Sequence, residues 1–144
     1  MELKFIKTSP TENMTLLIET PVPREQQLSV AQRLISYGSV YGEQAGYIEA
    51  PQSPPAAKRL QMMAGEFCGN ATLSLAAWLA KEAELSVGET RAYLLEVSGA
   101  AGLVRCEITK GETDFFGKVA MPLPKSVGER SFALDGEQME LATV

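Results

Sequence analysis

The segment Cys68-Gly69-Asn70 is the part of this 144-residue sequence best suited to chemistry. A strand-like run ends at Gly65, and a long apolar run that predicts a buried helix begins at Ala71. The thiol therefore stands at a helix N-terminus. Free amide N–H groups and the positive end of the helix dipole favour a thiolate there, and the thiolate is the reactive form of cysteine. The same N–H groups can bind the carboxylate of a ligand.

Proton transfer on an amino acid is the chemistry that this arrangement suits. A thiolate can take the α-proton from one face, and a thiol can return a proton from the other. Gly69 has no side chain and lets the backbone approach a ligand closely. The structural alternative is a buried cysteine followed by Asn70 as an ordinary helix N-cap. Position alone leaves both interpretations open.

Other candidate residues are less distinctive. Glu66 can be a general acid or base beside Cys68, or a solvated turn residue near the helix dipole. Asn13 lies in a turn and Gln44 lies just before a strand, where polar residues are common. Cys106 alternates with apolar neighbours along a strand, which predicts a position in the core.

The sequence contains no histidine and two cysteines. A Cys-His or Ser-His nucleophile pair is therefore excluded within this chain. Two cysteines cannot complete a zinc site, so we expect no metal. Any chemistry has to use cysteine, carboxylate, amide and backbone groups.

Composition is that of an ordinary soluble globular protein, with 45% hydrophobic and 22% charged residues and a net charge of −5. No basic cluster is present, so nucleic acid and anionic membranes are not expected as partners. No apolar run is long enough to span a bilayer, and the N-terminus alternates like a strand rather than forming a signal peptide. Two distant cysteines without a disulfide pattern favour a reducing cytoplasm.

The spacing of apolar residues predicts one α+β domain, residues 1–144, with about eight strands and two helices. Pro23 is suited to open a helix that continues to Ile35, and the second helix is expected over residues 71–85. Apolar residues surround the second helix, which predicts a mixed, curved sheet wrapped around it. Asp135-Gly136 predicts a tight hairpin turn. The last strand ends at Val144 while still apolar, so we expect the chain to be cut there or to continue in a partner.

One motif has a family resemblance. Residues 66–72, Glu-Phe-Cys-Gly-Asn-Ala-Thr, resemble the first catalytic-cysteine motif of the diaminopimelate epimerase-like superfamily. Residues 10–15 resemble that family's first turn, in which an asparagine contacts substrate, and residues 41–49 resemble its second, in which a glutamine does. Val97-Ser98-Gly99 and Met121-Pro122 match later landmarks. The histidine racemases of opine-metallophore pathways are the branch it resembles most, and residues 62–65 lack the asparagine of a true diaminopimelate epimerase loop.

The resemblance implies a cofactor-independent racemase or epimerase that needs no pyridoxal phosphate. Its fold has two similar halves, with one cysteine from each half facing a small-molecule amino acid in the cleft between them. This chain is then equivalent to the N-terminal half and inactive alone, because the C-terminal half and its cysteine are absent. Cys68 is implied as catalytic; Asn13, Gln44, Gly69 and Asn70 are implied as substrate-binding.

Two alternatives stay open. One is an isomerase of the phenazine-biosynthesis type, in which Glu66 is the acid or base. The other is a non-catalytic binding domain that pairs with itself. Such a homodimer would bring two copies of Cys68 across one cleft.

Overall fold

The computed structural model describes residues 2–124 and 126–143. Within them lie nine strands, two α-helices and one short 3-10 turn. Seven strands form one sheet, and the last two form a separate hairpin. The elements are β1 (Phe5–Thr8), η1 (Pro10–Glu12), β2 (Thr15–Ile18), α1 (Arg24–Ile35), β3 (Gln44–Glu49), β4 (Lys58–Met62), α2 (Gly69–Glu82), β5 (Thr90–Val97), β6 (Val104–Lys110), β7 (Phe115–Val119), β8 (Gly128–Leu134) and β9 (Glu137–Thr143).

The seven-stranded sheet is mixed, and its strands lie side by side in chain order. The pairs β2–β3 and β4–β5 are parallel, and the other neighbours are antiparallel. A parallel pair requires a crossover connection, and each crossover in this sheet contains one helix, α1 in the first and α2 in the second. The two helices pack on different hydrophobic clusters. Leu17 of β2 faces the cluster of α2, whereas Leu16 and Ile18 face that of α1. The helices therefore cover opposite faces of the sheet.

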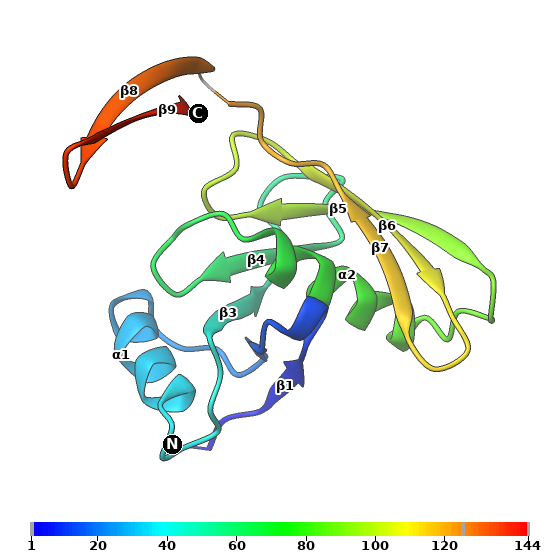
Figure 1. Ribbon diagram of the computed structural model, residues 1–144. Helices are drawn as coiled ribbons and strands as arrows, with labels where there is room; N and C mark the ends of the chain where they lie inside the picture. Colours follow the sequence, from blue (N-terminus) through cyan, green and yellow to red (C-terminus); the bar gives the residue numbers. More distant parts are fainter. Residues whose placement is uncertain (1, 125, 144) are drawn as a thin grey trace.

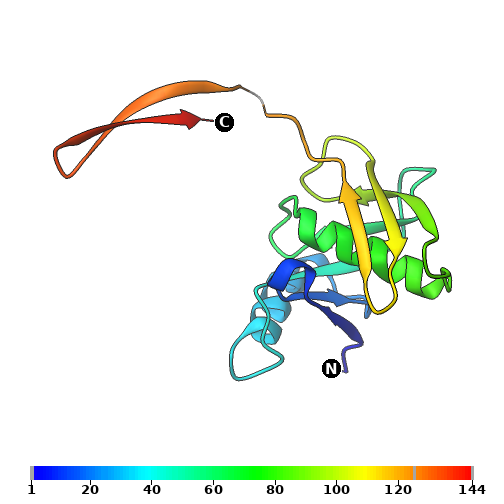
Figure 2. The ribbon, with the colours of Figure 1, turned by 45° about the vertical axis from the view of Figure 1, so that its right-hand side comes forward.

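Helix α2 is enclosed by the curved sheet. It packs against β2, β3, β5, β6, β7 and the turn η1 (Figures 1 and 2). Leu75, Ala76 and Ala80 are fully buried, and the helix emerges into solvent at Lys81. The prediction of an enclosed apolar helix is confirmed, and the helix begins two residues earlier than expected, at Gly69. Neither helix of the described residues has the length and apolar character to cross a membrane.

Cys106 belongs to the core, as its alternation in the sequence predicted. Val104, Cys106 and Ile108 of β6 are buried against α2. Burial raises the pKa of the Cys106 thiol to about 11, because an apolar environment disfavours the thiolate. Cys106 is therefore an inert structural residue in this fold.

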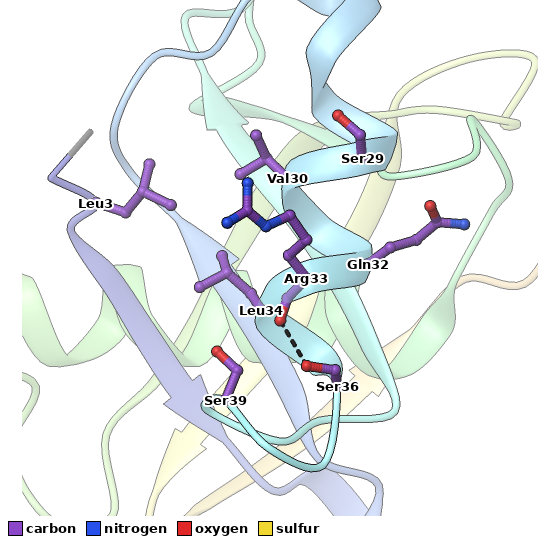
Figure 3. A pocket seen from close by; sticks show the side chains of 8 residues that line it. All are labelled: Leu3, Ser29, Val30, Gln32, Arg33, Leu34, Ser36 and Ser39. Carbon is purple, nitrogen blue, oxygen red and sulfur yellow. Dashed lines mark hydrogen bonds between the residues drawn. The ribbon is translucent and has the colours of Figure 1, made fainter.

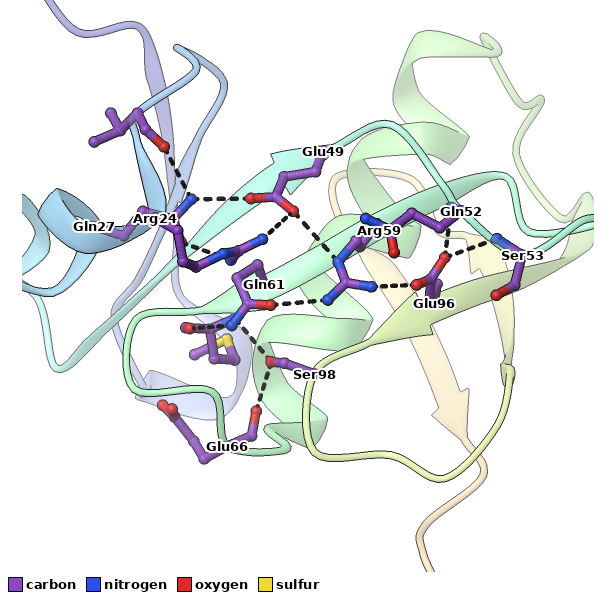
Figure 4. A network of polar contacts seen from close by, with 12 residues as sticks. Arg24, Gln27, Glu49, Gln52, Ser53, Arg59, Gln61, Glu66, Glu96 and Ser98 are labelled. Atoms are coloured by element: carbon purple, nitrogen blue, oxygen red, sulfur yellow. Dashed lines mark hydrogen bonds and ion pairs between the residues drawn. The ribbon is translucent and has the colours of Figure 1, made fainter.

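A polar network joins β3, β4 and β5 on the side of the sheet away from α2 (Figure 4). Glu49 is paired with Arg24 at 2.9 Å and with Arg59 at 3.3 Å, and Arg59 is also paired with Glu96. The amide of Gln52 donates to the Glu96 carboxylate over 2.7 Å, and this bond is the main cause of a lowered Glu96 pKa. The network fixes β4, the strand that leads to Cys68, against both of its neighbours.

The β8–β9 hairpin stands clear of the seven-stranded sheet (Figure 2). Its turn is the predicted one, with φ of +51° at Asp135 and +86° at Gly136. The expected single sheet of about eight strands is therefore seven strands plus a separate hairpin, within the predicted α+β class. The strand register places the apolar side chains of the hairpin on one exposed face, formed by Phe132, Leu134, Met139 and Leu141.

Truncating Leu75 tests the central role of α2. Its side chain is fully buried among the strands, so Leu75→Ala leaves a cavity and should lower the free energy of unfolding by about 2–5 kcal/mol. Urea denaturation measures this loss. Leu123→Ala is the matched control, since Leu123 is 90% exposed and the change should cost about 0.5 kcal/mol or less. Equal effects of the two substitutions would contradict the described core.

Candidate active site

Cys68 is the N-cap residue of α2. Its Sγ atom accepts a hydrogen bond from the amide of Ala71 over 3.4 Å. Its carbonyl oxygen accepts from the amide and from the hydroxyl of Thr72, at 3.0 and 2.6 Å. The alternative in which Asn70 caps the helix is wrong, because Asn70 lies inside the first turn and its side chain points elsewhere. The half-buried thiol stands beside the first turn of amide N–H groups.

Four of the predicted site residues meet in one hydrogen-bonded group, which we call the Cys68 cluster: Asn13, Gln44, Cys68 and Asn70. The Sγ atom of Cys68 donates to Oε1 of Gln44 over 2.8 Å. Nε2 of Gln44 donates to Oδ1 of Asn13 over 2.5 Å, and Nδ2 of Asn70 donates to the same oxygen over 3.3 Å. The thiol therefore contacts the amide of Gln44, which is linked through Asn13 to the amide of Asn70.

The topology of the sheet brings these residues together. Strands β2 and β3 are parallel, and Thr15 at the start of β2 is paired with Gln44 at the start of β3. Asn13 lies two residues before the start of β2, so it is at the same edge of the sheet. The turn before Asn13 has left-handed φ angles at two non-glycine residues, +48° at Thr11 and +66° at Glu12. Such backbone conformations are costly and concentrate at functional sites.

Gly69, the fifth predicted residue, also has a steric role that was not predicted. A Cβ atom there would lie 3.2 Å from Sδ of Met121 and 3.8 Å from Cγ1 of Val119. The missing side chain therefore leaves space for Met121 and Val119. The backbone N–H groups of Gly69 and Asn70, in the first turn of α2, have no intrahelical acceptor.

Glu66 lies outside the Cys68 cluster. Its side chain is exposed, and its carboxylate accepts a hydrogen bond from the amide of Ala64 over 3.0 Å. Its backbone carbonyl accepts from the hydroxyl of Ser98 (Figure 4). This geometry matches the interpretation of Glu66 as a turn residue more closely than that of a general acid.

The end of β5 positions the loop that carries Cys68. The buried Ser98 hydroxyl accepts from the amide of Met62 at 2.9 Å and donates to the carbonyl of Glu66 at 2.8 Å, so it bridges the two ends of the loop. Gly99 has φ of +74°, and a Cβ atom there would lie only 2.4 Å from the Phe67 nitrogen. The sequence analysis marked these residues as family landmarks, and their contact with the loop was not predicted.

Two further members of the site were missed. The hydroxyl of Thr15 accepts from Nε2 of Gln44 over 2.7 Å, and the carboxylate of Glu43 accepts from Nδ2 of Asn13. Thr15 directly precedes the apolar run of residues 16–18, and a polar residue at that place in an expected strand was an available signal. Glu43 had none beyond its position next to Gln44, because a charged residue before a strand is ordinary.

A hollow of about 750 Å³ lies elsewhere, alongside α1 (Figure 3). None of its lining residues belongs to the Cys68 cluster; they are Leu3, Ser29, Val30, Gln32, Arg33, Leu34, Ser36 and Ser39. Within residues 2–124 and 126–143, no three His, Cys, Asp or Glu side chains gather as a metal ion would require.

Solved structures of racemases and epimerases share this fold. A probable proline racemase from Agrobacterium radiobacter superposes with a TM-score of 0.70 at 14% identity, over 98% of this chain and 48% of that one. A hydroxyproline epimerase from Agrobacterium vitis superposes with a TM-score of 0.68 at 12% identity, over 97% of this chain and 48% of that one. The fold is therefore that of the proline racemase and epimerase class, as the resemblance implied.

The particular family follows from the sequence. Residues 2–144 match the family model of the histidine racemase CntK N-terminal domain, and the chain belongs to that family. A histidine racemase of Fusobacterium nucleatum subsp. nucleatum is 33% identical over 83% of this chain and 44% of its own length. A histidine racemase of Staphylococcus aureus is 34% identical over 74% of this chain and 38% of its own length. The chain thus spans less than half the length of these relatives.

A substitution at Gly99 tests whether the end of β5 holds the cysteine loop. Gly99→Ala meets both a positive φ and a backbone clash, so it should cost about 1–3 kcal/mol of stability and change the alkylation rate of Cys68. Gly102→Ala is the matched control in the same β5–β6 loop, because nothing lies within 4 Å of a Cβ there. Urea denaturation and mass-spectrometric alkylation rates measure the two effects. A harmless Gly99→Ala would refute the contact.

The two thiols should differ sharply in reactivity. Iodoacetamide should modify Cys68 in the native chain, since its thiol is only half-buried at a helix start. Cys106 should react only after denaturation, because it is fully buried and its pKa is raised to about 11. Peptide mass spectrometry identifies the modified residue. Native labelling of Cys106 ahead of Cys68 would contradict the described core.

Proposed function

We propose that this chain forms one half of a cofactor-independent amino-acid racemase and that Cys68 is one of its two proton-transfer groups. The observation that carries the proposal is the Cys68 cluster, in which a thiol at a helix N-terminus bonds to the first of three linked amide side chains. The family supports the reaction class, and the curated relatives, which are histidine racemases, support histidine as the substrate.

The reaction inverts the α-carbon with two opposed groups. A thiolate on one face removes the α-proton, and a thiol on the other face delivers a proton to the resulting carbanion. One proton leaves and one arrives, so no oxidant, reductant or metal is needed for the balance. The hydrogen bond that Cys68 donates to Gln44 requires a thiol that carries its proton. This contact therefore suits Cys68 as the group that delivers a proton. In the reverse direction Cys68 acts as the thiolate base.

Binding of the substrate is assigned to the start of α2. The amide N–H groups of Gly69 and Asn70 hold the α-carboxylate, where the helix dipole also favours negative charge. Charge that moves from the α-carbon into this carboxylate during proton removal is stabilised by the same groups. The side chains of Asn13 and Gln44 contact the α-amino or α-carboxyl end of the amino acid.

The opposite face of the substrate needs a second group from outside this chain. Cys68 reaches only one face, and Cys106 is buried in the core. We assign the second thiol to a further half of the protein, since this chain covers 44% and 38% of the curated relatives. A second copy of the chain is the alternative source. A reducing cytoplasm is the proposed location, because both thiols have to stay free.

Replacing Cys68 by serine tests the assignment in an enzyme that contains both halves. Serine retains a helix cap and a donor for Gln44, but its hydroxyl is a far weaker acid than a thiol. Exchange of the α-proton of histidine with deuterated water, followed by NMR without pyridoxal phosphate, should fall about 10²–10⁴-fold. The chain alone should show no exchange.

Cys106→Ala is the control for that experiment, and it should leave the exchange rate of folded enzyme within a few-fold of the wild type. Glu66→Gln distinguishes the glutamate-dependent isomerase. If Cys68→Ser kept the full exchange rate and Glu66→Gln lost it, Glu66 and not Cys68 would be the acid or base.

A further inference from the structure

We propose that Glu43 is a positioning residue that determines which end of the Gln44 amide faces the thiol of Cys68. This inference rests on the proposed function only in taking Cys68 as the reacting group. Glu43 contacts Asn13 and acts through it, without touching the thiol.

The chain of contacts begins at a group that can only accept. An ionised carboxylate has no proton to donate, whereas the amide of Asn13 has a donor end and an acceptor end. Nδ2 of Asn13 therefore has to face Glu43, as it does. Oδ1 of Asn13 is then turned the other way, where it accepts from Gln44 at 2.5 Å and from Asn70 at 3.3 Å.

The orientation of Gln44 follows from that of Asn13. An acceptor on Asn13 requires the NH₂ end of Gln44 to point toward it, so Oε1 of Gln44 is left facing Cys68, 2.8 Å from Sγ. The hydroxyl of Thr15 donates to the backbone carbonyl of Asn13 over 3.2 Å and accepts from the same NH₂ group over 2.7 Å, so it favours the same orientation of Gln44. Glu43 is the charged group among the contacts that lead to Gln44, and the backbone carbonyl of Asn13, acting through Thr15, is a second, neutral one of fixed polarity.

This orientation favours one protonation state of the thiol. An oxygen acceptor stabilises an S–H group, whereas an NH₂ donor in its place would stabilise a thiolate. Glu43 therefore biases Cys68 toward the protonated form that delivers a proton. If the charge of Glu43 is removed, the Asn13 and Gln44 amides can turn over together once the Thr15 hydroxyl rotates away from the carbonyl of Asn13, and the thiolate gains a donor.

The other charged groups around Cys68 do not supply this effect. Glu12 in η1 and Glu66 in the loop are exposed, and the Glu66 carboxylate bonds to the amide of Ala64. Strands β6 and β7 turn Val104, Cys106, Ile108 and Val119 toward α2, so alternation places Glu107 and Lys118 on the other side. In the described part of the chain, no lysine or arginine forms an ion pair with Glu43.

Alkylation of Cys68 in this chain measures the effect without any need for racemase activity. Glu43→Gln should raise the iodoacetamide rate of Cys68 near neutral pH about fivefold, the factor that one net hydrogen bond represents, and should move the pH–rate profile to lower pH. Glu43→Asp keeps an acceptor-only group and should restore most of the wild-type profile. Glu66→Gln, which also removes one exposed negative charge, should change the rate less than twofold.

A double-mutant cycle separates the relay from a direct effect of charge. In an Asn13→Ala background the connection between Glu43 and Gln44 is missing, so Glu43→Gln should add no further increase. A through-space effect of the Glu43 charge would persist in that background and would overturn the proposal, as would an unchanged rate in Glu43→Gln. Protection of Cys106 in each variant shows that the fold is intact. The alkylation result does not depend on racemase activity, so it would remain valid if the proposed racemase function were wrong.

Discussion

The enclosure of α2 by the sheet is the constraint on which the rest of the structure depends. A helix that packs against five strands has one allowed position along its axis, because its small buried residues interdigitate with the strands around them. Its first residue is then fixed in space, and so is the thiol that caps it. The network on the other side of the sheet holds β4 and thus fixes the strand that leads into this point. Stability and site geometry share one set of contacts.

The site itself depends on polar groups that the apolar core does not orient. Packing determines where the side chains of Asn13 and Gln44 lie, but an amide is nearly symmetric in shape, so packing cannot tell its oxygen from its nitrogen. Charge makes that distinction. A protein that uses amides to tune a thiol therefore needs a group of fixed polarity nearby, even if that group lies at the surface.

Local and periodic features could be predicted from the sequence. The Asp135-Gly136 turn, the enclosed helix and the core position of Cys106 each follow from a pattern within a short segment. The separate position of β8 and β9 could not be predicted, since pairing with a sheet depends on residues distant in the sequence. The same holds for the contact of Gly99 with the cysteine loop and for the space that Gly69 leaves to Met121. Both are steric relations between segments about 30 to 50 positions apart, and no local pattern records them.

The β8–β9 hairpin has a consequence for the behaviour of the chain in solution. Each of its two strands has one edge whose backbone N–H and C=O groups are unpaired within the described structure, and one of its faces is apolar. Unpaired edges of this kind are templates for strand addition by a neighbouring molecule. The net charge of −5 opposes such encounters through mutual repulsion, and salt screens that repulsion. Colloidal stability of the isolated chain therefore depends on ionic strength, and concentrated samples in high salt are the ones most exposed to fibrous association.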